Sequence, residues 1–264
     1  MSASAASAAR LLATIEYDGT SFHGSQLQPG VRTVQREVEA ALSRLFDRRT
    51  RIDLAGRTDA GVHATAQEIA FAAPRRWDAD ELARALGAVL PDDIGVRRVR
   101  ETAADFHPRF DAEARRYRYA IATGARRRPF LRDRCWSPGW PLDPEALARL
   151  AAAISGERSF ERFARAGQPE RGTRCRVGSA IWLFDRPPFA FFEIVADRFL
   201  HHMVRYLVGT SVEIAAGRRP FDDFERLLAG EAGSRPVFPA PPGGLYLTGV
   251  RYAGEWNSDP DLLW

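Results

Sequence analysis

The sequence contains no lysine, so all 38 of its basic residues are arginine, against 34 acidic residues and a formal net charge of +4. Arginine stays charged and places two N–H donors on one phosphate, which suits a polyanionic partner such as nucleic acid. A GC-rich genome also replaces lysine by arginine, and we assign most of this bias to codon usage. The net positive charge remains as a weak indication of a nucleic-acid partner.

Cysteine is also scarce, since only Cys135 and Cys175 occur. Two cysteines are too few for a disulfide framework or a four-thiolate zinc site, which predicts a reduced, cytoplasmic protein. No apolar run approaches the roughly 20 residues of a membrane-spanning helix. The Ala/Ser-rich residues 1–10 are expected to form a disordered tail.

Three common site motifs are missing from the sequence: a Walker loop, a GxGxxG turn after a strand, and HExxH. The sequence therefore predicts no bound nucleotide, no organic cofactor and no metal. His63 lies four residues after Asp59, and His201 adjoins His202, so a metal hydrolase is one alternative. The spacing of these residues is not that of a known ligand set.

Strand and helix patterns alternate along the chain in an order that predicts the fold class. The first half contains, in order, strand 11–17, a helix beginning near residue 33, strands 51–55 and 66–73, helix 78–89 and strand 94–99. The second half contains strand 115–122, helix 144–154, strands 175–184 and 189–195, helices 199–216 and 221–228, and strand 245–252. The βαββαβ order predicts an α+β fold of two ferredoxin-like lobes, residues 11–105 and 106–264, whose antiparallel sheets join around a central cleft.

The segment AGRTDAGVHA, residues 55–64, places Asp59 on a turn between Gly56 and Gly61. A carboxylate on a glycine-flanked loop after a strand is typical of a catalytic group presented into a cleft. Asp is equally common in solvated turns, where its side chain bonds its own backbone. The loop alone does not choose between these interpretations.

The helix that follows FLHHMVR carries an arginine beside an apolar face. Its apolar residues recur at helical spacing, which predicts a buried helix: Leu200, Val204, Leu207, Val208 and Ser211. Arg205 lies next to this face and one turn before Gly209, which leaves room for another backbone or a ligand. A buried guanidinium needs an anionic partner, for which Asp59 is a candidate; a structural ion pair with another carboxylate is the alternative.

Two arginine-rich segments suit RNA. In RRYRY, residues 115–119, strand alternation puts Tyr117 and Tyr119 on one face and Arg116 and Arg118 on the other. Aromatic rings between cations can stack on bases, although tyrosine is also an ordinary core residue of strands. Arg126, Arg127 and Arg128 form a basic loop that is either a solvated surface or a phosphate-binding site.

The Asp59 segment resembles the signature loop of the tRNA pseudouridine synthase A family, and further segments resemble that family in the same order. These segments are YDGT (17–20), RTVQ (32–35), LPDDI (90–94), FHPRFDA (106–112), RRYRY (115–119), FLHHMVR (199–205) and GLYL (244–247). One departure is visible: the family usually reads GWQ where this chain has Gly24, Ser25 and Gln26.

The resemblance implies a homodimeric pseudouridine synthase that isomerises uridine at positions 38, 39 and 40 of the tRNA anticodon stem-loop without a cofactor or metal. It implies that Asp59 is the catalytic nucleophile or base, with Arg205 as its ion-pair partner. Tyr117 and Leu245 would contact the target base, and Arg57 would help hold the place of the flipped nucleotide or its phosphate. The alternative from another class is a non-catalytic RNA-binding protein built from ferredoxin-like modules, in which Asp59 would be expendable.

Overall fold

The computed structural model describes residues 9–74, 77–124, 128–165, 172–258. The described residues up to 113 and from 247 onward form one compact unit, and those between 114 and 246 form another. The last strand, which we expected in the second lobe, therefore belongs mainly to the first unit. Most of the expected tail lies outside the described residues, but residues 9 and 10 begin the first strand rather than belonging to the tail.

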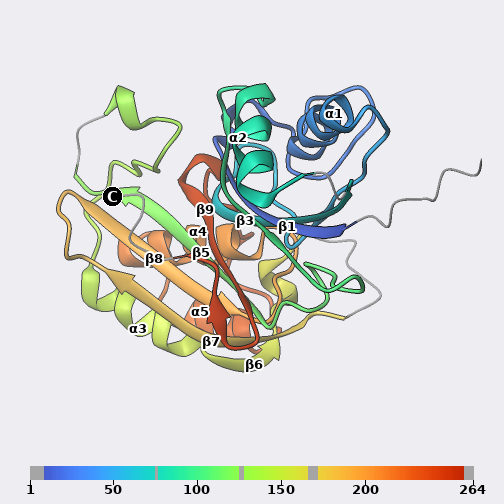
Figure 1. The fold of residues 1–264 in the computed structure, drawn as a ribbon. Helices are drawn as coiled ribbons and strands as arrows, with labels where there is room; N and C mark the ends of the chain where they lie inside the picture. The colour runs from blue at the N-terminus through green and yellow to red at the C-terminus, as the bar shows by residue number, and fades with distance from the viewer. Residues whose placement is uncertain (1–8, 75–76, 125–127, 166–171, 259–264) are drawn as a thin grey trace, which may run out of the picture. The chain divides into compact units, whose positions relative to one another are not determined.

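The first unit is a sheet covered on one face by two helices (Figure 1). Its elements are β1 (Ala9–Tyr17), α1 (Val34–Phe46), β2 (Asp53–Leu54), β3 (His63–Ala73), α2 (Ala79–Val89) and β4 (Ile94–Glu101), with a 3-10 turn at Gly19–Ser21. The strand order is β4-β1-β3, with β2 and β9 (Leu245–Tyr252) also beside β3, and β10 (Glu255–Trp256) pairs with β9. The βαββαβ order expected for this half is confirmed.

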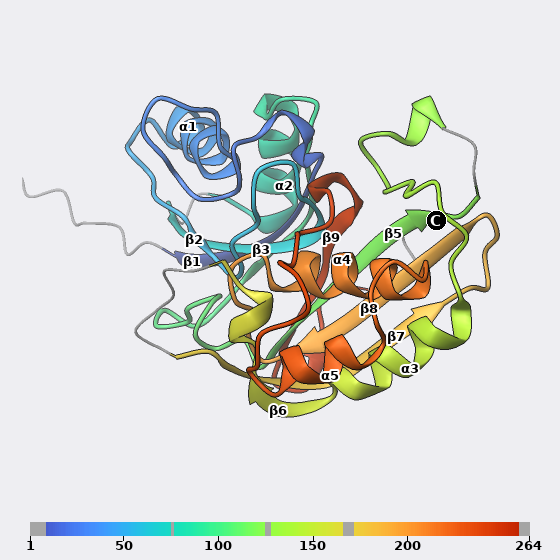
Figure 2. The ribbon, with the colours of Figure 1, turned by 180° about the vertical axis from the view of Figure 1, so that it is seen from behind.

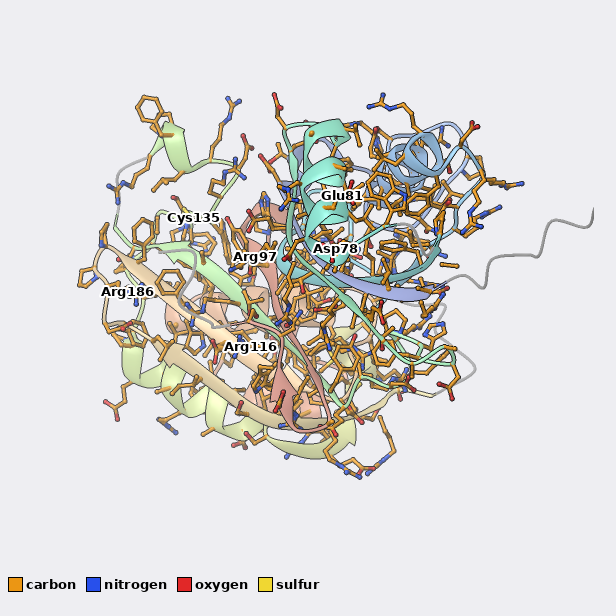
Figure 3. The ribbon with its side chains drawn as sticks, in the orientation of Figure 1. Asp78, Glu81, Arg97, Arg116, Cys135 and Arg186 are labelled. Atoms are coloured by element: carbon orange, nitrogen blue, oxygen red, sulfur yellow. The ribbon has the colours of Figure 1, made fainter. Side chains whose placement is uncertain are left out.

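Both helices of the first unit start at residues that bond the free N–H groups of the first turn. Thr33 accepts the Arg36 N–H at the start of α1, and Asp78 accepts N–H groups from Asp80 and Glu81 at the start of α2 (Figure 3). Such a cap stabilises a helix by about 1 kcal/mol. Each helix also buries an apolar face, which includes Val38 and Leu42 in α1 and Leu82 and Leu86 in α2.

The second unit is also a sheet with helices on one face, as Figure 2 shows. Its elements are β5 (Ala114–Ala122), α3 (Pro144–Ile154), β6 (Gly156–Ser159), β7 (Arg174–Leu183), β8 (Phe189–Ala196), α4 (Met203–Ala215) and α5 (Asp222–Leu228). Short 3-10 turns occupy Pro129–Leu131, Glu161–Phe163 and Pro242–Gly244. The strands lie in the order β5-β8-β7-β6, and neighbours are antiparallel.

Two local predictions for the second unit were wrong. Helix α4 begins at Met203 rather than at residue 199, because His202 has a left-handed backbone with φ of 63° that a continuing helix does not allow. The short strand β6 was missed, since four residues give too little alternation to recognise. The expected α+β class, with mostly antiparallel strands, is confirmed. Among the helices of the described residues, none is both long and apolar enough to cross a membrane.

Candidate active site

Asp59 lies in the loop between β2 and β3, and its side chain is partly exposed. Its carbonyl accepts the Val62 N–H at 3.1 Å, which closes a turn through Gly61. Gly61 has a φ of 76°, a conformation that costs a glycine little and other residues more. Arg57, two residues earlier, is exposed. The loop thus holds a carboxylate and a cation near the solvent on a defined turn.

The Gln67 side chain on β3 holds the beginning of this loop through two hydrogen bonds. Its side-chain amide donates to the Gly56 carbonyl at 2.7 Å and accepts the Gly56 N–H at 3.1 Å. Gln67 has no exposed surface, while Gly56 is partly exposed, so both bonds are part-buried. A planar amide that satisfies both backbone groups of one residue defines the position and the orientation of that residue.

Tyr17 supports the middle of the loop. Its hydroxyl forms a 2.8 Å hydrogen bond with the Thr58 hydroxyl, one residue before Asp59. Burial raises the pKa of Tyr17 to about 12, although hydrogen bonds with Thr58, Gln67 and Ser25 lower it. Tyr17 therefore stays neutral across the physiological range and acts as a hydrogen-bonding support for the loop.

The YDGT segment packs against the end of the same loop. A Cβ on Gly19 would lie 2.0 Å from the Val62 carbonyl oxygen, so only glycine fits there. The Gly19 N–H donates to Nδ1 of His63 at 3.0 Å, and His63 is 1% exposed. His63 therefore serves as a buried structural acceptor in this unit.

The RTVQ and LPDDI segments, which were noted in the sequence, meet beside the Asp59 loop. Arg32 in RTVQ forms two hydrogen bonds to the Asp93 carboxylate in LPDDI, at 2.6 and 2.9 Å. Arg32 also lies over the Phe22 ring, 4.3 Å from its centre, and Phe22 accepts the Gly61 N–H through its carbonyl. A bidentate ion pair of this kind fixes orientation as well as distance.

In the second unit, Arg205 on α4 contacts the backbone of a neighbouring segment. Its Nε donates to the Ala240 carbonyl at 2.8 Å, and its own carbonyl accepts the Ala240 N–H at 2.9 Å. One turn later, a Cβ on Gly209 would lie 2.4 Å from the Phe238 carbonyl oxygen. The expectation that Gly209 makes room for another backbone is confirmed.

The strand β5 carries the two tyrosines of RRYRY on one face, as expected. Tyr117 is buried and meets the Phe199 ring edge-on, with ring centres 4.9 Å apart. Tyr119 donates to the Pro241 carbonyl at 2.7 Å, and burial raises its pKa well above the usual value while Arg205 lowers it. Leu245, the first residue of β9, is 5% exposed. Tyr119 is therefore a core residue.

The alternate residues of β5 point to the opposite face. Arg118 donates to the Glu193 carboxylate on β8 at 2.9 Å and lies over the Phe191 ring. Figure 3 labels Arg116, the other arginine of this face. Both arginine side chains belong to residues that are less than a tenth exposed. The basic character of RRYRY is thus largely buried in the described structure.

The predicted basic loop is described only in part. Arg126 and Arg127 lie outside the described residues, whereas Arg128 is exposed. The next turn exposes Phe130 completely and leaves the Arg132 side chain 81% exposed. After this turn in the chain comes Cys135, labelled in Figure 3, a free and buried thiol whose pKa is raised by burial.

The structure assigns the expected site residues to separate units. Asp59 and Arg57 belong to the first unit, and Tyr117, Arg205 and Leu245 to the second. The proposed ion pair between Asp59 and Arg205 stays a prediction. The buried support of the Asp59 loop was missed, although one signal pointed to it: Gln67 shares a face of β3 with the core residues Ile69 and Phe71. A polar residue on a core face needs a buried partner.

Known proteins are similar to this chain over most of its length. A family model described as tRNA pseudouridine synthase matches residues 13–111 and 150–253. The chain is 38% identical to tRNA pseudouridine synthase A of Syntrophomonas wolfei, over 92% of this chain and 97% of that protein. It is 41% identical to that of Geobacillus kaustophilus, over 93% and 95%, and 40% identical to that of Moorella thermoacetica, over 90% and 98%.

The family match, together with an α+β fold of mostly antiparallel strands, therefore defines a pseudouridine synthase. Within that class, the chain belongs to the tRNA pseudouridine synthase family, which confirms the resemblance found in the sequence. A structural comparison also aligns 77% of the chain with 43% of a chain in the crystal structure of the archaeal box H/ACA sRNP Nop10-Cbf5 complex. The identity there is 11% and the TM-score 0.33, a level that carries no weight for the fold.

Proposed function

We propose that this protein isomerises uridine to pseudouridine at positions 38, 39 and 40 in the anticodon stem-loop of tRNA. The observation that carries the proposal is Asp59 on a loop in which a buried hydrogen bond fixes Thr58 and two part-buried ones fix Gly56. Such fixation places a reactive group reproducibly against its target atom, and orientation of this kind lowers the barrier of a reaction.

The isomerisation breaks the bond between ribose C1′ and uracil N1, turns the base, and joins C1′ to C5. The proton on C5 is lost and N1 gains one, so the product is an isomer of the substrate. Asp59 either attacks C1′ and is later displaced, or removes a ribose proton as a base; both roles need the ionised carboxylate. An adjacent Arg205 guanidinium would favour that ionised form.

Other parts of the proposal concern substrate contacts and assembly. The target uridine must leave the RNA stack, and Tyr117 with Leu245 would contact the flipped base. Arg57 would help hold the place of the flipped nucleotide or its phosphate. Arg126–Arg128, together with the exposed Phe130, would contact the RNA backbone and bases. The protein would act in the cytoplasm as a homodimer of two-lobed chains, without metal or organic cofactor.

The proposal is tested by incubating the purified protein with unmodified tRNA transcript and no added cofactor, and mapping pseudouridine along the RNA. We expect modification at positions 38 to 40 with and without a chelator. Binding of the transcript without any modification would favour the non-catalytic RNA-binding alternative. Modification that the chelator stops would contradict the metal-free mechanism.

The ring of Tyr117 should matter more than its hydroxyl. We expect Tyr117→Phe to keep kcat within about threefold of wild type, because stacking on a base uses the ring. Tyr117→Ala should lower kcat/KM by about 10- to 100-fold, since a stacked base contributes roughly 1–3 kcal/mol. Steady-state kinetics on one tRNA transcript distinguishes the variants. Equal losses in both would assign the role to the hydroxyl instead.

A further inference from the structure

Ser25 lies in the segment between the Gly19–Ser21 turn and α1, and it has no exposed surface. Its hydroxyl oxygen accepts the Thr58 N–H at 2.9 Å, and its backbone N–H donates to the Thr58 carbonyl at 3.0 Å. One residue thus bonds both backbone groups of Thr58. Because Thr58 immediately precedes Asp59, these two bonds define where the chain enters the Asp59 position.

The surroundings leave Thr58 little freedom to move away from Ser25. Gly24 has a φ of 91°, and a Cβ there would lie 2.9 Å from the Thr58 carbonyl oxygen. On the side-chain side, Tyr17 holds the Thr58 hydroxyl. Ser25 itself is anchored to α1, because its carbonyl accepts the Gln35 N–H at 2.9 Å. The Asp59 loop is therefore connected through Thr58 and Ser25 to a helix of the first unit.

We propose that Ser25 is a positioning residue for Asp59, and this inference rests on the proposed function of Asp59. The Thr58 N–H is a buried donor, so it needs an acceptor within the fold. In this chain the serine hydroxyl supplies that acceptor. Removing it would leave the Thr58 N–H buried without a partner, so the chain at Thr58 would shift toward another acceptor.

The matched control is Ser43 on α1, whose hydroxyl oxygen accepts the Thr50 N–H, also at 2.9 Å. Ser25→Ala and Ser43→Ala therefore delete the same kind of bond in the same unit, one beside Asp59 and one remote from its loop. We expect Ser25→Ala to lower kcat on tRNA transcript by about 10- to 100-fold, with KM within about twofold of wild type. Ser43→Ala should leave both constants within about twofold.

A second variant keeps the test decisive if Ser25→Ala does not fold. Ser25→Cys preserves the size of the side chain, but sulfur is a weaker acceptor, so its kcat should fall between wild type and Ser25→Ala. Thermal unfolding of each variant separates lost stability from lost turnover. Wild-type kcat in folded Ser25→Ala, or in Ser25→Cys where Ala does not fold, would overturn the positioning role. So would equal losses of kcat in the Ser25 and Ser43 variants.

The same experiment separates this inference from the proposed function. If wild-type protein forms no pseudouridine, or if Asp59→Asn retains turnover, the proposed function of Asp59 fails. If wild type is active and Asp59→Asn is not, while Ser25→Ala turns over normally, only the role of Ser25 fails.

Discussion

Asp59→Asn is expected to abolish pseudouridine formation, lowering kcat at least about 1,000-fold, while the affinity for tRNA stays within about threefold of wild type. Asparagine keeps the size of the side chain but is neither a nucleophile nor a base of comparable strength. Binding should persist because an extended RNA is held by many separate phosphate contacts. Pseudouridine mapping after single-turnover incubation, together with a filter-binding titration, measures both quantities.

A matched control for this change is Asp78→Asn. Asp78 caps α2 and accepts two backbone N–H groups there, and asparagine caps helices about as well. We therefore expect Asp78→Asn to keep wild-type activity and binding. Substantial turnover by Asp59→Asn would contradict a catalytic Asp59, and joint loss of activity and tRNA binding would point to a folding defect or an RNA contact instead.

The sequence predicts an element well where its local signals agree. Helix α3 was expected at 144–154 and has those bounds, because Asp143 caps it, Pro144 suits its first turn and the apolar residues follow a helical period. Helix α4 was started too early because its apolar period continues through Leu200, whereas the backbone at His202 is left-handed. Periodicity reports which side chains are apolar, and it carries no information about a single φ angle.

The same limit applies to the candidate site. Asp59 could be recognised from its own segment, since the glycines and the carboxylate are adjacent in sequence. Its support could not, because Ser25 and Thr58 are 33 positions apart and meet only through the packing of the first unit. In the sequence, Ser25 stood out only as a departure from the resemblance to the family. Only the structure shows what the serine hydroxyl does.

In the second unit, a buried ion pair anchors the segment that leads to Ala240, the residue whose backbone bonds Arg205. The Arg219 side chain has no exposed surface and bonds Glu213 at 2.9 Å, the Pro236 carbonyl at 2.7 Å, and Asp223. Asp223 in turn accepts the Ser234 N–H at 2.6 Å. The chain from Ser234 to Pro236 is thus fastened to α4 and α5 a few residues before it reaches Ala240.

Asp223→Ala should therefore lower the free energy of unfolding by about 3–5 kcal/mol, because it leaves the buried Arg219 without its closest carboxylate. The neighbouring Asp222→Ala removes an exposed carboxylate from the same turn and should change stability by less than about 0.5 kcal/mol. Chemical denaturation of the three proteins gives the comparison. A loss in Asp223→Ala no larger than in Asp222→Ala would show that the remaining partners of Arg219 suffice.

The pKa of Asp223 predicts how this difference depends on pH. Burial raises that pKa, but bonds from the Ser234 N–H, Arg219 and the Ser234 hydroxyl outweigh burial and hold it below its usual value. A carboxyl whose pKa is lower in the folded state stabilises the fold above its unfolded pKa of about 3.9, and this contribution is lost as the pH falls through the folded pKa. Asp223→Asn resembles the protonated form, so its stability deficit should be full at pH 7 and shrink below about pH 4. A deficit that stayed constant down to the pH of acid unfolding would mean that the charge of Asp223 contributes nothing, and that its hydrogen bonds alone fasten the segment leading to Arg205.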